Sequence, residues 1–348
     1  MIGISQPYWP EVATTPREVA AAARPRTDVL APRTVALVRR VEFVDAARGV
    51  AVLGMLIANL VNVFLRDIPP VLAHNQGDSL RLFDFPAPAF QFLVGVSLTL
   101  FLRNRVATGR TLQQARIDAL RRFTLLIGLG VLLDGIGTLS LFPHWGVLQT
   151  LGLGGALAIL LVDAPMVACA AVAAVLLVAF SGLENGEVHA GPFAALAFLP
   201  LTVAGVVVGR GLGTVGPTPQ FIRRAALVGA GAFLLAGALF ADGVPFNKVV
   251  GTSSFVALTA GTTAALLAGL AGFEATGRRF PAWLLVLGRD ALTAWVLLYV
   301  LVYYPAWLVH PGWSQIAFAP GALAALTTMV ALSSLTVALG RRGLRVRL

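Results

Sequence analysis

The sequence has little charge, one cysteine and one lysine. Only 12% of its 348 residues are charged, whereas 57% are hydrophobic and the mean hydropathy is +0.83. A soluble domain of average composition is roughly 25% charged and 45–50% apolar, because polar groups must cover its surface. The single cysteine, Cys169, excludes an intrachain disulfide and a cysteine-based metal site. These shortages exclude an ordinary soluble globular domain.

The charge that is present is mostly positive and unevenly placed. The net charge is +10, with Lys248 as the only lysine and arginine as the other basic residue. In a soluble protein this excess would suggest binding to nucleic acid. Here the arginines gather in short segments between apolar runs, where positive residues orient membrane helices. We therefore expect a membrane protein with no nucleic-acid partner.

Apolar runs dominate the chain from residue 43 to residue 340. A helix needs about 20 apolar residues to cross the hydrocarbon core, and these runs are too long and too uniform for transmembrane strands. We predict an all-α bundle of about ten spans, with eleven as the alternative, in which Asp163 and Pro165 separate the fourth span from the fifth. The ten segments are residues 43–65, 84–102, 122–141, 146–163, 166–182, 192–209, 222–241, 249–272, 282–303 and 317–339.

The spans divide the chain into three parts and two sides. Residues 1–36 lack a sustained apolar run, so we expect a disordered cytoplasmic tail and no signal peptide. Residues 37–340 form the membrane domain and residues 341–348 a basic cytoplasmic tail. With ten spans, the arginine-rich segments and both termini fall on one side of the membrane. By the positive-inside rule we expect this side to be the cytoplasm. The histidines fall on the opposite side, namely His74, His144, His189 and His310.

Polar residues inside spans suggest function, because they are costly there. Asp45 and Arg48 are three residues apart at the cytoplasmic end of the first span, where they can pair on one helix face. Such a pair can also simply anchor the end of the helix. Asn59 and Asn62 lie in the outer half of the first span, and Gln91, Asp134 and Gln149 lie in the second, third and fourth. Together these residues could line a polar cavity.

One outer loop contains the residue types needed for proton transfer. His74 lies in it with Asp78, Arg81 and Asp84, just before the second span. Histidine is the usual general base near neutral pH, although a histidine at a membrane surface can also be an ordinary solvated residue. His310 differs, because it lies among residues typical of an interfacial aromatic belt: Tyr303, Tyr304, Trp307 and Trp313.

Several common reaction centres are missing from the sequence. There is no HExxH motif and no close pair of histidines, so we expect no metal site. There is no GxSxG motif to start a serine hydrolase. There is also no P-loop, which argues against ATP-driven transport.

Five blocks of sequence occur in the order of a known family. The first follows Arg40 in VDAARGVAVLGMLIAN, where Asp45, Arg48 and Asn59 form a D-x-x-R-G start that ends in asparagine. The second is the histidine loop and the next helix, HNQGDSLRLFDFPAPAFQFLVGVS. The blocks WGVLQTLGL, VPFNKVVGTSSF and LGRDAL follow. Together they resemble the transmembrane acetyltransferases typified by heparan-α-glucosaminide N-acetyltransferase and its bacterial relatives.

The sequence also departs from the pattern of this family. Gly77, Asp78 and Ser79 replace a Trp-Asn-Gly sequence after the histidine, and an arginine expected just before GVLQ is absent. Gly251 replaces a tryptophan, and Asp290 replaces an asparagine. We expect these changes mainly near the acceptor side, so they bear on the acceptor more than on the reaction type.

The resemblance implies acetyl transfer across a bacterial plasma (inner) membrane. Acetyl-CoA would enter from the cytoplasm as a co-substrate, without a permanently bound cofactor, and an extracytoplasmic amino sugar or glycan would accept the acetyl group. His74 would act as general base or transient acetyl carrier, with Asn59 as the donor to the oxyanion and Asp84 as a further catalytic residue. The co-substrate would contact Asp45, Arg48, Arg121, Arg122 and Gln149, and the acceptor would contact Lys248, Asn247, Ser254 and His144.

Other interpretations stay open at this point. The arginines can serve only to orient the helices, and Lys248 can merely cap its loop. The chain can be a non-enzymatic transporter or exporter of a small or lipid-linked solute, although no internal repeat is evident. It can also belong to a related family that keeps the histidine loop without activity. Direct attack and a ping-pong route suit the residues equally, and a homodimer and membrane lipid are the other partners expected.

Overall fold

The computed structural model describes residues 41–73, 77–138, 140, 144–181, 191–212, 217–309 and 316–346. In these ranges the regular structure is helical, and the only β-type contact is an isolated bridge between Leu65 and Ile316. The predicted all-α class is therefore confirmed. The predicted tail at residues 1–36 lies outside the described residues, as do His74, His189, His310 and Trp313.

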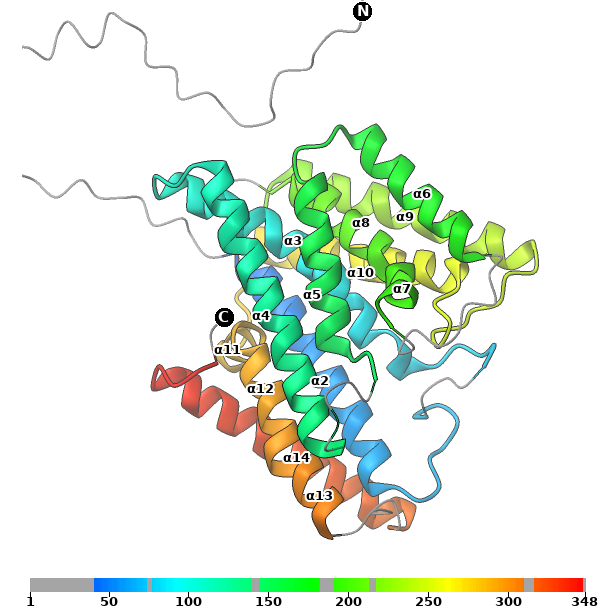
Figure 1. Ribbon diagram of the computed structural model, residues 1–348, viewed down its shortest axis with the longest axis vertical. Helices are drawn as coiled ribbons and strands as arrows, with labels where there is room; N and C mark the ends of the chain where they lie inside the picture. Colours follow the sequence, from blue (N-terminus) through cyan, green and yellow to red (C-terminus); the bar gives the residue numbers. More distant parts are fainter. Residues whose placement is uncertain are drawn as a thin grey trace, which may run out of the picture. The chain divides into compact units, whose positions relative to one another are not determined.

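Figure 1 shows how the described helices are arranged. The elements are α2 (Glu42–Phe64), η1 (Leu82–Asp84), α3 (Pro86–Ala107), α4 (Leu112–Thr138), α5 (Val147–Ala158), η2 (Ile159–Leu161), α6 (Met166–Ser181), α7 (Pro192–Ala195), η4 (Leu196–Phe198), α8 (Leu199–Gly209), α9 (Pro219–Ala241), α10 (Ser253–Ala275), α11 (Ala282–Arg289), α12 (Ala291–Leu298), the π-helical η5 (Tyr299–Tyr303), α13 (Tyr304–Val309) and α14 (Phe318–Arg341).

Seven helical stretches of the described chain are long and apolar enough to cross a membrane. Two shorter apolar helices, Val147–Leu161 and Met166–Phe180, cover two further predicted spans. Helix α4 covers the remaining one, but it begins ten residues before the predicted start at residue 122, with a polar stretch that includes Arg116 and Asp118. Each predicted segment thus contains helix, while the number of spans and the side on which the termini lie stay predictions.

The predicted span at residues 282–303 is not one continuous helix. Helix α11 ends at Arg289 and α12 begins at Ala291, and the apolar stretch then runs on to Val309. Asp290 lies at this break, where its buried carboxylate is 3.2 Å from the guanidinium of Arg289 and 3.5 Å from that of Arg345 near the C-terminus. The expectation that Asp290 lies near the acceptor side stays a prediction.

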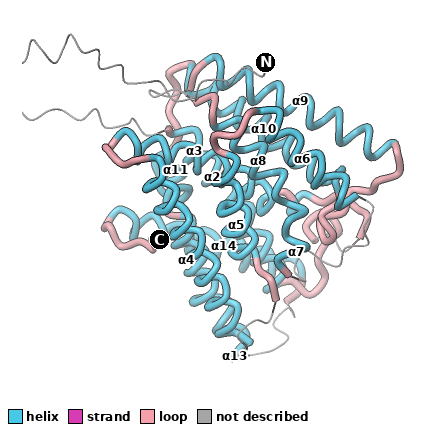
Figure 2. The backbone as a smooth tube through the Cα atoms, turned by 45° about the horizontal axis from the view of Figure 1, so that its top comes forward, coloured by secondary structure: helices cyan, strands magenta, loops and turns pink. Residues whose placement is uncertain are grey.

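Helix α2 lies at the centre of the packing. It contacts α3, α10, α11, α12 and α14, while α3 packs along α8, α4 along α5, and α9 along α10 (Figures 1 and 2). Small residues allow the closest approaches, as is common between membrane helices. A Cβ atom on Gly288 of α11 would lie 1.8 Å from the carbonyl oxygen of Asp45. This close fit fixes α11 against the first half of α2.

Candidate functional site

The first half of α2 carries an ion pair that also reaches α3. The guanidinium of Arg48 lies 3.1 Å from the carboxylate of Asp45, one helical turn earlier. Arg48 also donates a hydrogen bond to the hydroxyl of Ser97 on α3. The predicted pairing of these two residues is therefore present, and the contact with Ser97 fixes the direction in which Arg48 extends.

Three arginines from three helices come together next to this pair. The guanidinium groups of Arg105 on α3 and Arg122 on α4 lie 5.2 and 4.8 Å from the centre of the Phe101 ring. The positive charges of Arg48 and Arg105 both act on Arg122. We call Arg48, Arg105 and Arg122 the arginine cluster. It is a concentration of positive charge suited to an anionic ligand.

Sequence reasoning named Arg48 and Arg122 as candidate ligands but missed Arg105. The sequence could have indicated Arg105, because Phe101 and Arg105 are four residues apart and so share a helix face. Arg121, also named as a candidate, is exposed, and the contacts with Phe101 do not include it.

Asn59 lies near the other end of α2, where its side chain is fixed by two hydrogen bonds. Its amide nitrogen donates to the carbonyl oxygen of Met55 at 2.7 Å, and its amide oxygen accepts from the hydroxyl of Tyr303 at 2.5 Å. A carboxamide nitrogen carries two N–H donors. The bond to Met55 uses one of them, which leaves the amide able to donate a second bond.

Tyr303 and Tyr299 belong to a segment of π-helix, and Tyr304 follows at the start of α13. The hydroxyl of Tyr299 donates to Asp134 at 2.6 Å, and that of Tyr304 donates to the carbonyl oxygen of Leu133 at 2.8 Å. Short π-helical segments occur frequently at functional sites. The interpretation of Tyr303 and Tyr304 as part of an interfacial belt stays a prediction. Sequence reasoning missed Tyr299, although its spacing of four residues from Tyr303 indicated a shared face.

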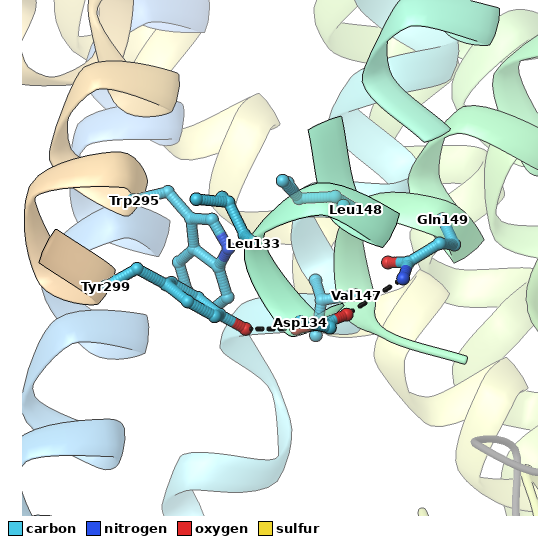
Figure 3. Close-up of a pocket in the computed structure, with 8 residues that line it drawn as sticks. Leu133, Asp134, Val147, Leu148, Gln149, Trp295 and Tyr299 are labelled. Carbon is cyan, nitrogen blue, oxygen red and sulfur yellow. Dashed lines mark hydrogen bonds between the residues drawn. The ribbon is translucent and has the colours of Figure 1, made fainter. Parts of the chain in front are cut away.

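Asp134 is the centre of a small polar group on α4, shown in Figure 3. Its side chain is 4% exposed and accepts a hydrogen bond of 2.8 Å from the amide nitrogen of Gln149 as well as the bond from Tyr299. The imidazole Nε2 of His144 lies 3.7 Å from the same carboxylate. Asp134, Gln149 and Tyr299 line a small pocket together with Gly130, Leu133, Val147, Leu148 and Trp295.

This geometry brings together two residues that the sequence analysis assigned to different ligands. Gln149, expected to contact acetyl-CoA together with Arg48, donates to Asp134 from the start of α5. His144, expected to contact the acceptor, lies beside the same carboxylate. The structure thus joins Gln149 and His144 to one group with Asp134 and Tyr299.

The remaining predicted site residues connect two loops. The carboxylate of Asp84 is fully buried and lies 3.8 Å from the ammonium group of Lys248. The amide nitrogen of Asn247 donates to Asp78 at 2.9 Å. Burial lowers the pKa of the Lys248 ammonium group below its ordinary value, while the nearby carboxylate of Asp84 opposes this effect. Lys248 and Asn247 therefore hold the end of the loop in which His74 was predicted to act.

Two further contacts complete this region. The hydroxyl of Ser254 donates to the carbonyl oxygen of Pro245 at 2.6 Å, so Ser254 stabilises its own loop. The start of α3 packs against α2, because a Cβ atom on Gly54 would lie 2.7 Å from the ring of Pro86. The end of the histidine loop is thereby held about five residues along α2 from Asn59, or roughly 7.5 Å at 1.5 Å per residue.

The candidate residues form groups at opposite ends of the same helices. Arg48 lies in the first half of α2 and Asn59 in its last turns, eleven residues or about 16 Å further along the helix. On α4, Arg122 likewise lies nearer the start of the helix and Asp134 nearer its end. One end thus gathers positive charge, and the other gathers an amide, a carboxylate and an imidazole. The described residues contain no group of three or more His, Cys, Asp or Glu side chains that could hold a metal ion.

The comparison with known families gives one match. Residues 40–207 match the family described as heparan-alpha-glucosaminide N-acetyltransferase, catalytic. No curated protein matches the chain. The matched stretch runs through α8 and includes Arg48, Asn59, Asp134 and Gln149, whereas Tyr299, Tyr303 and Lys248 lie beyond it.

Proposed function

Residues 40–207 belong to the family of heparan-alpha-glucosaminide N-acetyltransferase catalytic domains, and from this premise we propose a reaction for the chain. The chain is an integral membrane protein with seven helices fit to cross a membrane in its described part, and its family is one of acetyltransferases. It transfers an acetyl group from cytoplasmic acetyl-CoA to an amino sugar or glycan on the opposite side. A bacterial inner membrane is the location we propose for it.

The observation that carries this proposal is the separation of the arginine cluster from Asn59 along α2. Acetyl-CoA carries several phosphate charges, and charge-assisted hydrogen bonds to guanidinium groups are among the stronger polar contacts in proteins. Arg48, Arg105 and Arg122 offer three such groups on α2, α3 and α4. Asp45 orients Arg48 for this role, and exposed Arg121 extends the basic surface.

Asn59 supports the chemical step at the other end. When an amine attacks a thioester, the carbonyl oxygen becomes negatively charged, and a fixed N–H donor stabilises it. The bonds to Met55 and Tyr303 hold the carboxamide of Asn59 in one orientation, with a second N–H available. His74 acts as the general base or as a transient acetyl carrier, and both routes stay open.

The loop residues shape the acceptor side in this proposal. Lys248 and Asn247 hold the stretch from Asp78 to Asp84, so they act on the acceptor through the position of the histidine loop. Ser254 supports the loop that carries Lys248. Dimer formation and bound lipid, expected from the resemblance, are kept as proposals.

Acetyl transfer from radiolabelled acetyl-CoA to glucosamine by the purified protein in detergent tests the proposed reaction. We expect transfer by the wild type and loss of transfer in His74→Ala, with thermal stabilisation by CoA retained in the variant. Normal transfer by His74→Ala would show that the role of His74 is wrong. Stabilisation by candidate solutes, with no stabilisation by CoA and no transfer, would favour the transporter instead.

A further inference from the structure

Asp134 and His144 form a pair that connects the interior of the bundle with its surface. The carboxylate of Asp134 is 4% exposed, whereas the imidazole of His144 is 48% exposed and lies 3.7 Å away. This distance is within ion-pair range and slightly longer than a hydrogen bond. The buried acid therefore has an ionisable contact that is open to solvent.

The same pair lies close to Asn59 through two tyrosines. Tyr299 donates to Asp134 and Tyr303 donates to Asn59, and the two rings meet edge to face with centroids 5.0 Å apart. The groups that face the pair from neighbouring elements are the hydroxyls of Tyr299, Tyr303 and Tyr304 and the neutral amide of Gln149. A buried carboxylate next to a candidate reaction centre is costly, and such groups in membrane proteins are commonly proton relays.

We propose that Asp134 and His144 together accept the proton that leaves the acceptor amine and release it to solvent at the surface. This inference rests on the proposed acetyl transfer. In that reaction the amine nitrogen forms a bond to the acetyl carbon, and the bond from that carbon to its leaving group breaks. The leaving group departs with the electron pair, and the amine must lose one proton. The pair receives this proton, and the exposed imidazole returns it to the outside.

This role is distinct from that of His74. Whether His74 carries the acetyl group or takes the proton first, one proton per turnover has to leave the site before the next amine reacts. Asp134 accepts the proton inside the bundle, and His144 releases it at the surface. The hydrogen bonds from Tyr299 and Gln149 hold the carboxylate in place for this exchange.

The test compares the pH dependence of acetyl transfer in the wild type and in His144→Gln. General acid–base groups typically contribute about 10²–10⁴-fold to rate, so we expect kcat near neutral pH to fall about 100-fold. Added imidazole buffer should restore much of the rate, because the position is open to solvent. The KM for acetyl-CoA and thermal stabilisation by CoA should be unchanged. The matched control is His189→Gln, at a histidine outside the described residues that has no assigned role.

A second variant covers the buried member of the pair. Asp134→Asn keeps the shape and can still accept from Tyr299, so we expect a similar loss of kcat without rescue by imidazole. A wild-type kcat and pH profile in His144→Gln, or a loss that no concentration of imidazole relieves, would overturn the proposal. An absence of acetyl transfer by the wild-type protein itself would instead overturn the proposed function, so the two failures are distinguishable.

Discussion

Tyr303 contacts Asn59 from a distant part of the chain. Its hydroxyl is 2.5 Å from the amide oxygen of Asn59. In Tyr303→Phe that oxygen, which is half-buried, loses its partner, and one hydrogen bond typically contributes about 0.5–1.5 kcal/mol. We expect kcat for acetyl transfer to fall about 10-fold, with the KM for acetyl-CoA unchanged. A change confined to KM would contradict the assigned role.

The proposed role of the arginine cluster predicts a change in the KM for acetyl-CoA, and not in kcat. Arg122→Gln removes a positive charge beside Arg48 and Arg105, and a hydrogen bond to a charged group contributes about 1.5–3 kcal/mol. We expect the KM for acetyl-CoA to rise about 10-fold or more, with little change in kcat at saturation. The matched control is Arg116→Gln on the same helix, whose partner is Asp163 in a half-exposed pair. Equal effects of both substitutions would mean that the cluster does not bind CoA.

Helix α11 depends on close approach to α2. In Gly288→Ala the added methyl group would lie 1.8 Å from the carbonyl oxygen of Asp45, so the backbone of one helix must move. Overpacking typically costs about 1–3 kcal/mol and sometimes more. We expect a lower midpoint of thermal unfolding in detergent, together with weaker CoA stabilisation because Asp45 orients Arg48.

Gly269→Ala on α10 is the control for this prediction. A Cβ atom there meets nothing within 4 Å, and alanine is the better helix former by about 1 kcal/mol. We expect an unchanged or higher unfolding midpoint. If Gly288→Ala behaved in the same way, the packing of α11 against the first half of α2 would be wrong.

The loop between α9 and α10 predicts a dependence of stability on pH. Burial lowers the pKa of the Lys248 ammonium group, so the unfolded chain holds this proton at pH values where the folded chain has released it. Stability then rises with pH up to the ordinary lysine pKa of about 10.4. We expect this alkaline rise in the wild type to be reduced in Lys248→Met, measured by thermal unfolding between neutral pH and pH 10. Parallel curves for the two proteins would contradict the burial of a titrating Lys248.

At the level of elements, the sequence predicted where helices lie better than how they end. Each predicted apolar run contains helix, because hydrophobicity over about 20 residues is a local property. The contact between Asp290 and Arg345 was not predictable in this way, because the two residues are 55 positions apart in the sequence. The early start of α4 was missed for a different reason, since its polar first turns have no apolar run to reveal them.

The candidate site was predictable only where its residues are close in sequence. Asp45 and Arg48 are three residues apart and form the pair expected of that spacing. Tyr303 and Asn59 are 244 residues apart, and their hydrogen bond arises from the packing of distant helices. The hydrogen bond from Gln149 to Asp134 was missed for a similar reason, because nothing local in the sequence indicates Asp134 as its partner.

The whole molecule has two chemically different ends. Positive charge gathers around Arg48, while Asn59 and Asp134 lie towards the opposite ends of the same helices. A reaction that takes an anionic donor from one side and an amine from the other requires this separation. The central claim is therefore that the two substrates reach the protein from opposite sides of the membrane.

Transfer across sealed proteoliposomes tests this claim most directly. The protein is inserted with its arginine end facing outwards, and protease access to a C-terminal tag confirms this orientation. Glucosamine is enclosed in the vesicles, and radiolabelled acetyl-CoA is added outside. We predict labelled N-acetylglucosamine inside the vesicles, and none when the acetyl-CoA is enclosed and the glucosamine is outside. Product formed only when both substrates share one side would contradict the account.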